Sequence, residues 1–251
     1  MKHRRIGFWY RLAAIILRRP MMLLTRRDWS GAEHLGSGGA VVVVNHVSYF
    51  DPLAFAHFVD DAGRAPRFLG KAEVFEIPVV GRLISAAGQI PVHRETVNAA
   101  SAVREAVAAV TAGECVVVYP EATLTRDEHL WPMVGKTGAA RIALTTGCPV
   151  IPVAQWGPQE VLGGYEHIPR LLPRKVMHVR AGPSVDLARF ADRELDAAVL
   201  REATDTIMAA IVSMLELIRG ESAPVERFDP RARGGPPIGK PEQTDRPEGE
   251  R

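Results

Sequence analysis

The sequence is poor in the residues that bind metals or form disulfides. It has two cysteines among 251 residues, Cys115 and Cys148, and they lie far apart. Two cysteines without Cys-x-x-Cys spacing form neither a zinc site nor a redox pair. We therefore expect buried free thiols in a reducing compartment, and we expect neither a metal ion nor a cofactor.

Several catalytic motifs are also missing. The glycine-rich run at residues 36–39 precedes a strand instead of following one, which is the wrong side for a phosphate-binding loop. No Gly-x-Ser-x-Gly turn is present to carry a serine nucleophile, and no His-Glu-x-x-His pattern is present to bind zinc. These absences argue against a dinucleotide enzyme, a serine hydrolase and the common type of zinc protease.

Acidic residues are absent from the first 27 positions, which contain eight Lys and Arg. The whole chain carries 31 Lys and Arg against 29 Asp and Glu, so the remainder has 23 basic and 29 acidic residues, a charge of −6. A uniformly basic nucleic-acid binder would not show this asymmetry, and we expect no nucleic-acid partner.

The same N-terminal segment lacks a long hydrophobic run. Its uncharged stretches are far shorter than the roughly 20 residues that a membrane-spanning helix needs, and no small-residue cleavage site follows, so a signal peptide is not indicated. Aromatic and aliphatic residues interleaved with arginines are typical of interfacial helices on an anionic leaflet. We predict two short helices of this kind within residues 1–28. The alternative is that the apolar face packs on the domain and the arginines are merely solvated.

Apolar segments with strand and helix patterns alternate along the rest of the chain. The predicted strands lie near residues 40–44, 66–69, 88–92, 115–119, 149–153 and 176–180. The predicted helices lie near residues 52–60, 97–111, 136–146 and 193–218. This alternation predicts one α/β domain over residues 29–220, with a mixed, mostly parallel sheet flanked by helices. Residues 221–251 are mainly Pro, Gly and charge, which predicts a disordered tail.

A histidine and an aspartate follow the four-valine run at residues 41–44. The run predicts a buried strand, His46 lies just beyond it, and Asp51 is placed as the N-cap of a helix that starts at Pro52. Open α/β sheets bind their ligands at the carboxyl ends of strands, and a His–carboxylate pair can act as a general base. Residues five apart diverge on a regular helix, so the segment must turn if they are to meet. Alternatively, Asp51 is only a cap and His46 only a satisfied polar residue.

Polar residues follow two further predicted strands. After the strand at residues 115–119 come a carboxylate, Glu121, a hydroxyl, Thr123, and a guanidinium, Arg126. A surface turn is the alternative interpretation of that segment. Lys71 follows the strand near residues 66–69, where a lone lysine is usually solvated. Beside the other two segments, Lys71 could bind an anion.

The order of these segments resembles the lysophosphatidic acid acyltransferases, the bacterial 1-acylglycerol-3-phosphate acyltransferases of the glycerolipid acyltransferase superfamily. The similarity covers about residues 40–155. The first motif, His-x4-Asp, matches residues 45–51, and the second is similar to residues 70–81, with the segment after it at 90–94. The third motif, Phe-Pro-Glu-Gly-Thr-Arg-Ser, resembles residues 119–123, and the fourth resembles residues 150–153. Each motif alone is weak, but four in order at plausible spacing are specific.

The resemblance implies an enzyme that moves a fatty acyl group from acyl-CoA or acyl carrier protein to lysophosphatidic acid, forming phosphatidic acid. His46 would take the proton from the acceptor hydroxyl, and Asp51 would orient His46. Lys71 and Arg126 would hold phosphate, with Arg94 among the substrate-binding residues. Further implied partners are a lysophospholipid acceptor and an anionic membrane surface, which places the protein at the cytoplasmic face of the cell membrane.

The remaining implied site residues are Glu121 and Thr123, which would bind or organise the acceptor. The third motif departs from the family pattern because Ala122 replaces its glycine and Leu124 stands where its arginine would be. Leucine cannot bind phosphate as arginine does. This departure keeps open an acyltransferase for a different lysolipid or glycolipid. A non-catalytic lipid-binding protein at the membrane surface is another alternative, although the intact His46 and Asp51 argue against it. A thioesterase, which would release free fatty acid without an acceptor, is a third.

Overall fold

The computed structural model describes residues 8–92, 99–164, 166, 168–230 and 232. The helices are α1 (Phe8–Leu24), α2 (Asp51–Asp61), α3 (Ala72–Phe75), α4 (Val80–Ala86), α5 (Ala99–Thr111), α6 (Gly138–Thr146), α7 (Pro158–Val161) and α8 (Ala197–Arg219). The strands are β1 (Thr25–Ser30), β2 (Ala40–Val44), β3 (Pro66–Lys71), β4 (Ile90–Val92), β5 (Cys115–Val118), β6 (Val150–Trp156) and β7 (Lys175–Ala181). Each predicted strand and helix of the α/β domain is present, with boundaries shifted by a few residues.

The strands form one sheet of order β1-β7-β6-β2-β5-β3-β4. The pairs are parallel except for β6 and β7, which run antiparallel. The predicted class, an α/β domain with a mixed, mostly parallel sheet, is confirmed. Crossovers between parallel strands place helices on both faces of the sheet.

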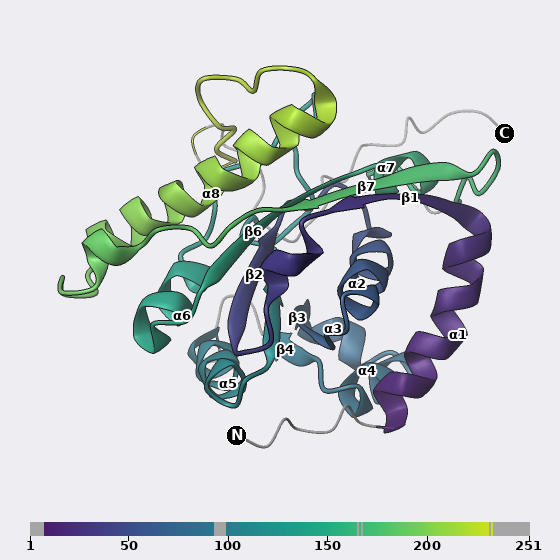
Figure 1. Ribbon diagram of the computed structural model, residues 1–251, viewed down its shortest axis with the longest axis horizontal. Helices are drawn as coiled ribbons and strands as arrows, with labels where there is room; N and C mark the ends of the chain where they lie inside the picture. The colour runs from purple at the N-terminus through teal and green to yellow at the C-terminus, as the bar shows by residue number, and fades with distance from the viewer. Residues whose placement is uncertain (1–7, 93–98, 165, 167, 231, 233–251) are drawn as a thin grey trace, which may run out of the picture.

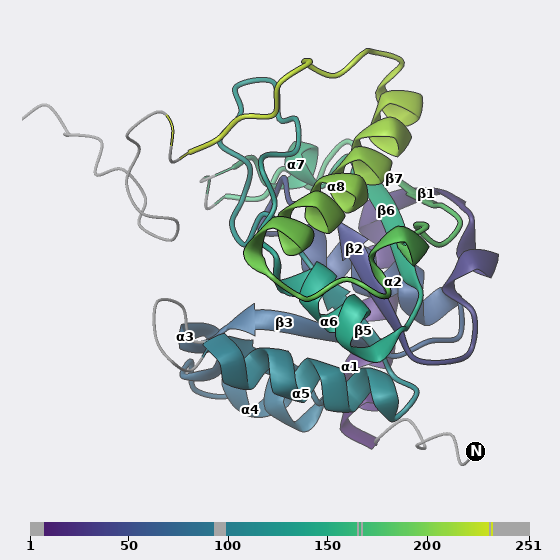
Figure 2. The ribbon, with the colours of Figure 1, turned by 90° about the vertical axis from the view of Figure 1, so that its left-hand side faces the viewer.

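Strand β2 is the central strand of the sheet, with α5, α6 and α8 on one side of it and α2 on the other (Figures 1 and 2). Val41 and Val43 pack on one side with residues of α5, α6 and α8, whereas Val42 and Val44 pack on the other side with residues of α2. All four valines are fully buried. A strand covered on both faces needs no polar alternation, which explains the uninterrupted valine run.

The N-terminal segment differs from the prediction in two respects. Residues 8–24 form one helix, α1, which continues through Pro20 instead of dividing into two. The turn after the proline is retained because Met21 is buried and packs with Ala54 and Met177. Residues 25–30 form the edge strand β1, parallel to β7, although the sequence predicted no strand there. Within the described ranges, no helix is both long and apolar enough to span a bilayer.

The tail prediction is wrong for its first ten residues. Arg227 forms an ion pair with Asp205 of α8 at 2.5 Å, and Phe228 accepts a main-chain hydrogen bond from Val134 at 3.0 Å. These contacts hold residues 221–230 against the domain, which the polar composition of the segment does not reveal. Residues 231 and 233–251 lie outside the described part of the chain.

Candidate active site

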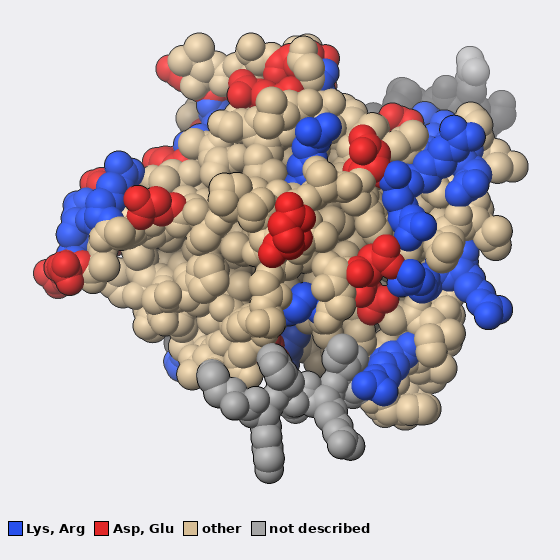
Figure 3. All heavy atoms as spheres, viewed as in Figure 1, with Lys and Arg blue, Asp and Glu red and all other residues tan. Residues whose placement is uncertain are grey.

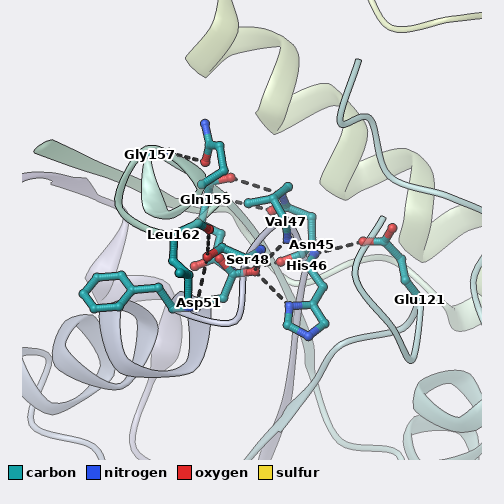
Figure 4. Close-up of polar contacts among 11 residues, drawn as sticks. Asn45, His46, Val47, Ser48, Asp51, Glu121, Gln155, Gly157 and Leu162 are labelled. Carbon is teal, nitrogen blue, oxygen red and sulfur yellow. Dashed lines mark hydrogen bonds and ion pairs between the residues drawn. The ribbon is translucent and has the colours of Figure 1, made fainter. Parts of the chain in front are cut away.

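The carboxyl ends of β2, β3 and β5 meet at one edge of the sheet. Val43 of β2 pairs with Val118 of β5, so His46 and Glu121 each lie three residues beyond a paired position. Strand β3 is parallel to β5 and ends at Lys71. The topology therefore brings the three predicted polar segments to the same edge (Figure 4 shows the first two).

His46 and Asp51 form the central contact of this edge. The Nδ1 atom of His46 lies 2.8 Å from Oδ2 of Asp51, and the two side chains are 15% and 0% exposed. The intervening residues 45–50 form the turn that the spacing required. If the carboxylate accepts a hydrogen bond from Nδ1–H, the Nε2 atom carries the lone pair, which is the tautomer of a general base.

Asp51 also closes the turn that carries His46. Its Oδ2 atom accepts main-chain hydrogen bonds from Val47 at 2.7 Å and Ser48 at 3.0 Å (Figure 4). Asp51 is thus the first residue of α2, with Phe50 as the N-cap, and its carboxylate binds the preceding loop instead of capping the helix. Burial raises the pKa of Asp51 above its ordinary value, and the hydrogen bonds from His46, Ser48 and Val47 oppose that shift.

Glu121 binds the main chain of the site. Its Oε1 atom accepts the N–H of His46 and its Oε2 atom accepts the N–H of Met133, each at 2.9 Å. The residue is 1% exposed. That Glu121 binds or organises the acceptor stays a prediction, because these contacts join both of its oxygens to the main chain. Burial raises the pKa of Glu121 to about 8, although both hydrogen bonds act to lower it.

His46 is held from two further directions. The N–H of Thr125 donates to the carbonyl of His46 at 2.8 Å. The ring of Tyr119 stacks on the imidazole, with ring centroids 4.2 Å apart and an interplanar angle of 26°. Together with the Glu121 contact, these interactions fix both the backbone and the ring plane of His46.

The sequence prediction missed the residues that join this turn to β6. Asn45 and Gln155, both fully buried, make three hydrogen bonds of 2.8–3.0 Å that link their side chains and main chains. The hydroxyl of Ser48 donates to the carbonyl of Leu162 at 2.6 Å. One signal was available, because Gln155 is a polar residue near the carboxyl end of an inner strand.

The predicted phosphate-binding residues that the structure describes are more exposed than the two buried carboxyl groups of the site. The Nζ atom of Lys71 lies 3.2 Å from Oε1 of Glu73, and its side chain is 38% exposed. Arg126 is half-buried in the loop after β5, where its N–H lies 3.2 Å from Sδ of Met133. Arg94 lies outside the described residues. Lys71 ends β3 and Arg126 follows β5, so both belong to segments that leave the sheet at the edge that carries His46.

The two residues of the third motif that depart from the family pattern, Ala122 and Leu124, differ in their structural setting. Leu124, at the position of the family's arginine, is 2% exposed and therefore belongs to the interior. Ala122, at the position of the glycine, has φ of 59°, a left-handed conformation that glycine adopts without cost. Thr123 between them is half-buried.

An α/β sheet with a His–carboxylate pair at the end of an inner strand defines a class of protein equipped for acid–base chemistry. The family model named Acyltransferase matches residues 26–156 of the 251. The chain belongs to this family.

Two curated plant proteins resemble the central part of the chain. One is the chloroplastic 1-acyl-sn-glycerol-3-phosphate acyltransferase BAT2 of Brassica napus, 31% identical over 140 residues, which are 55% of this chain and 39% of BAT2. The other is lysophospholipid acyltransferase LPEAT1 of Arabidopsis thaliana, 32% identical over 156 residues, which are 55% of this chain and 36% of LPEAT1. The match thus spans less than half the length of either relative.

The fold also matches a solved structure, the 1-acyl-sn-glycerophosphate acyltransferase PlsC from Thermotoga maritima. The TM-score is 0.62 at 22% sequence identity, and the match covers 85% of this chain and 81% of that protein. This similarity establishes the fold of a glycerolipid acyltransferase for most of the chain.

Proposed function

We propose that this protein transfers a fatty acyl group from a thioester, acyl-CoA or acyl carrier protein, to the free hydroxyl of lysophosphatidic acid, and so forms phosphatidic acid. The observation that carries the proposal is the 2.8 Å contact between His46 Nδ1 and Asp51 Oδ2 at the carboxyl edge of the sheet. Membership of the acyltransferase family and the name of BAT2 support the reaction class.

The reaction is a direct transfer in this proposal. Nε2 of His46 takes the proton as the acceptor hydroxyl attacks the thioester carbonyl, and Asp51 stabilises the imidazolium that results. The new ester bond forms, the carbon–sulfur bond breaks, and the proton passes from His46 to the departing thiolate. No nucleophile of the enzyme is needed, so no covalent intermediate forms.

In the same proposal, cations at the sheet edge hold the phosphate of the acceptor. Lys71 is the first candidate and Arg126 the second, with Arg94 and Thr123 as further substrate contacts. Glu121 acts through His46 and the 121–133 loop because its two oxygens are engaged by main-chain N–H groups.

A second candidate acceptor is a lysolipid with a different head group. The buried Leu124 favours it, because a leucine at that position supplies no cation for a phosphate monoester. LPEAT1, which has the broader name lysophospholipid acyltransferase, is 32% identical to the matched part of this chain, and BAT2 is 31% identical.

The proposal also includes an anionic membrane surface, at the cytoplasmic face of the cell membrane, as the site of action. Helix α1 exposes large apolar side chains that recur every seven residues, or about two turns, and therefore share one face. They are Phe8, Trp9, Ile15, Ile16, Met22 and Leu23. This exposure argues against the alternative in which the apolar face packs on the domain.

The test compares the purified protein with its His46→Ala variant. Each is incubated with palmitoyl-CoA or palmitoyl-acyl carrier protein and a panel of lysolipids, and the products are identified by mass spectrometry. We expect phosphatidic acid from lysophosphatidic acid, reduced about 10²–10⁴-fold in the variant, because a general base contributes that much.

Other outcomes separate the alternatives. Product from another lysolipid alone would retain the chemistry and replace the acceptor. A folded His46→Ala variant with normal activity would contradict the role of His46. No His46-dependent product with either donor and any acceptor would favour the non-catalytic lipid-binding protein.

A further inference from the structure

The segment after Lys71, which includes most of the second motif, exposes apolar side chains on the surface. Across α3, α4 and their connection, five aliphatic residues are between 39% and 64% exposed. They are Val74, Ile77, Val79, Val80 and Leu83. We call this set the α3–α4 patch. A cluster of this kind on a protein surface is typical of an interaction site.

The backbone of the patch is strained at its most exposed valine. Val79 has φ of 68°, a conformation that is costly for a β-branched residue, and it is 64% exposed. Gly81 fixes the close approach of α4 to α3, because a Cβ atom there would lie 1.9 Å from the carbonyl oxygen of Phe75. The fold therefore holds an apolar side chain outward at an energetic cost that its own packing does not explain.

Part of the α3–α4 patch lies beside α1. Helix α4 packs beside α1 (Figure 1). Exposed arginines accompany the apolar residues on both helices: Arg11 and Arg19 on α1, and Arg82 on α4. Lys and Arg side chains gather on the side of the molecule where α1 lies (Figure 3). Apolar side chains flanked by cations complement an anionic lipid surface.

The position of the patch suits a lipid substrate. Lys71 is the last residue of β3, and α3 starts at the next residue, so the patch adjoins the sheet edge that carries His46. The cation Lys71 therefore lies next to an apolar surface, which complements a lysolipid, because a lysolipid joins an anionic head group to an apolar chain. Glu73 and Glu76 are also exposed here, so contact at the patch must rest on apolar burial more than on charge.

We infer that the α3–α4 patch is a second membrane contact, which enters the same leaflet as α1 and brings the Lys71 edge to the lipid surface. The delivery of lysolipid to that edge rests on the proposed function. The shared leaflet likewise rests on the membrane contact of α1 in that proposal, whereas binding of the patch to vesicles does not depend on acyl transfer.

The experiment measures partition onto vesicles of equimolar phosphatidylglycerol and phosphatidylcholine by co-sedimentation. The test variant combines Ile77→Ser and Leu83→Ser. The matched control combines Leu217→Ser and Val225→Ser, whose side chains are 71% and 104% exposed near the end of α8 and beyond it. We expect the test variant to bind at least about tenfold more weakly and the control to change less than about twofold, because lost apolar burial weakens interfacial binding.

A second readout locates the contact directly. A polarity-sensitive fluorophore on Leu83→Cys, in a Cys148→Ala background, should shift to shorter wavelength with vesicles, whereas the same probe on Leu217→Cys should not. Equal binding by the test and control variants, or no shift at position 83, would overturn the inference. A shift that depends on protein concentration without vesicles would instead assign the patch to a second copy of the chain.

The outcome is independent of catalysis. Vesicle binding is measured without substrate, and acyl transfer is assayed separately with a short-chain lysolipid below its micelle concentration. Absence of turnover in that assay would contradict the proposed function and leave the membrane contact standing.

Discussion

At the scale of the residue, Asp51 couples two roles in one oxygen. Its Oδ2 atom accepts from His46 Nδ1 and from the N–H groups of Val47 and Ser48. An Asp51→Asn variant therefore disturbs both the orientation of the imidazole and the closure of the turn. His46 is the cleaner probe of catalysis, because its side chain is partly exposed while its main chain is held by Glu121 and Thr125.

Ala122 gives a residue-scale prediction on stability. Its φ of 59° lies in the left-handed region, which costs an L-residue roughly 1–2 kcal/mol. Glycine avoids that cost but loses about 0.5–1 kcal/mol of chain entropy on folding. We therefore expect Ala122→Gly to raise the free energy of unfolding by about 0.5–1 kcal/mol, as measured by urea denaturation. A matched Ala→Gly change at exposed Ala100 of α5 should lower it. Destabilisation by Ala122→Gly would show that the turn relaxes its strain elsewhere.

At the scale of the element, sequence pattern predicted the strands that have a strong apolar signal. The valine-rich runs of β2 and β5 are buried on both faces, which leaves an uninterrupted pattern. Strand β1 escaped prediction because its residues, Thr-Arg-Arg-Asp-Trp-Ser, are mostly polar and its pairing with β7 lies on the sheet edge. Helices α3 and α7, of four residues each, are too short to show helical periodicity.

The sequence predicted the contacts of the site that are local in the chain and missed those between distant segments. His46 and Asp51 are five residues apart, so local spacing could suggest their contact. The bonds between Asn45 and Gln155 join positions 110 apart, and the bond from His46 to Glu121 joins positions 75 apart. Contacts of that range depend on strand register, which the order of segments does not give. The sequence therefore located Glu121 but could not show that it binds main chain.

Helix α1 gives an element-scale prediction because its arginines are not equivalent. Arg18 forms an ion pair with Asp61 at 2.5 Å, whereas Arg11 and Arg19 are exposed. Replacing both exposed arginines with glutamine should weaken binding to anionic vesicles by about 1 kcal/mol per residue, or about fivefold each. The same changes at exposed Arg104 and Arg141, on α5 and α6, are the matched control.

Varying the ionic strength and the lipid charge distinguishes a loss of electrostatic attraction to lipid from a change in the helix itself. Because salt screens exposed charges, the difference between the α1 variant and its control should shrink as salt rises, and it should vanish on neutral phosphatidylcholine vesicles. A difference that persisted on neutral vesicles would mean that the substitutions alter the helix instead of its electrostatic attraction to lipid.

At the scale of the whole molecule, the site is assembled from distant parts of one sheet. The turn at residues 45–51, the loop at 121–133 and the end of β6 each supply contacts to its polar cluster. Helix α2 starts at Asp51 within this cluster, and α1 packs against α2 (Figure 1). Because the turn and the loop share one buried carboxyl group, Glu121, the protonation of the site is linked to the stability of the entire fold.

That linkage sets the pH dependence of unfolding. Burial raises the pKa of Glu121 from 4.5 to about 8, so between these values the folded chain keeps a proton that the unfolded chain has lost. The free energy of unfolding should therefore fall as pH rises across this window, by up to about 1.4 kcal/mol per pH unit from this group. Glu121→Gln removes the titration, and the variant is expected to have lower stability but a shallower slope in urea denaturation between about pH 5 and pH 8. Parallel slopes for the two proteins would show that Glu121 is ionised in the folded state, held as a carboxylate by the N–H groups of His46 and Met133.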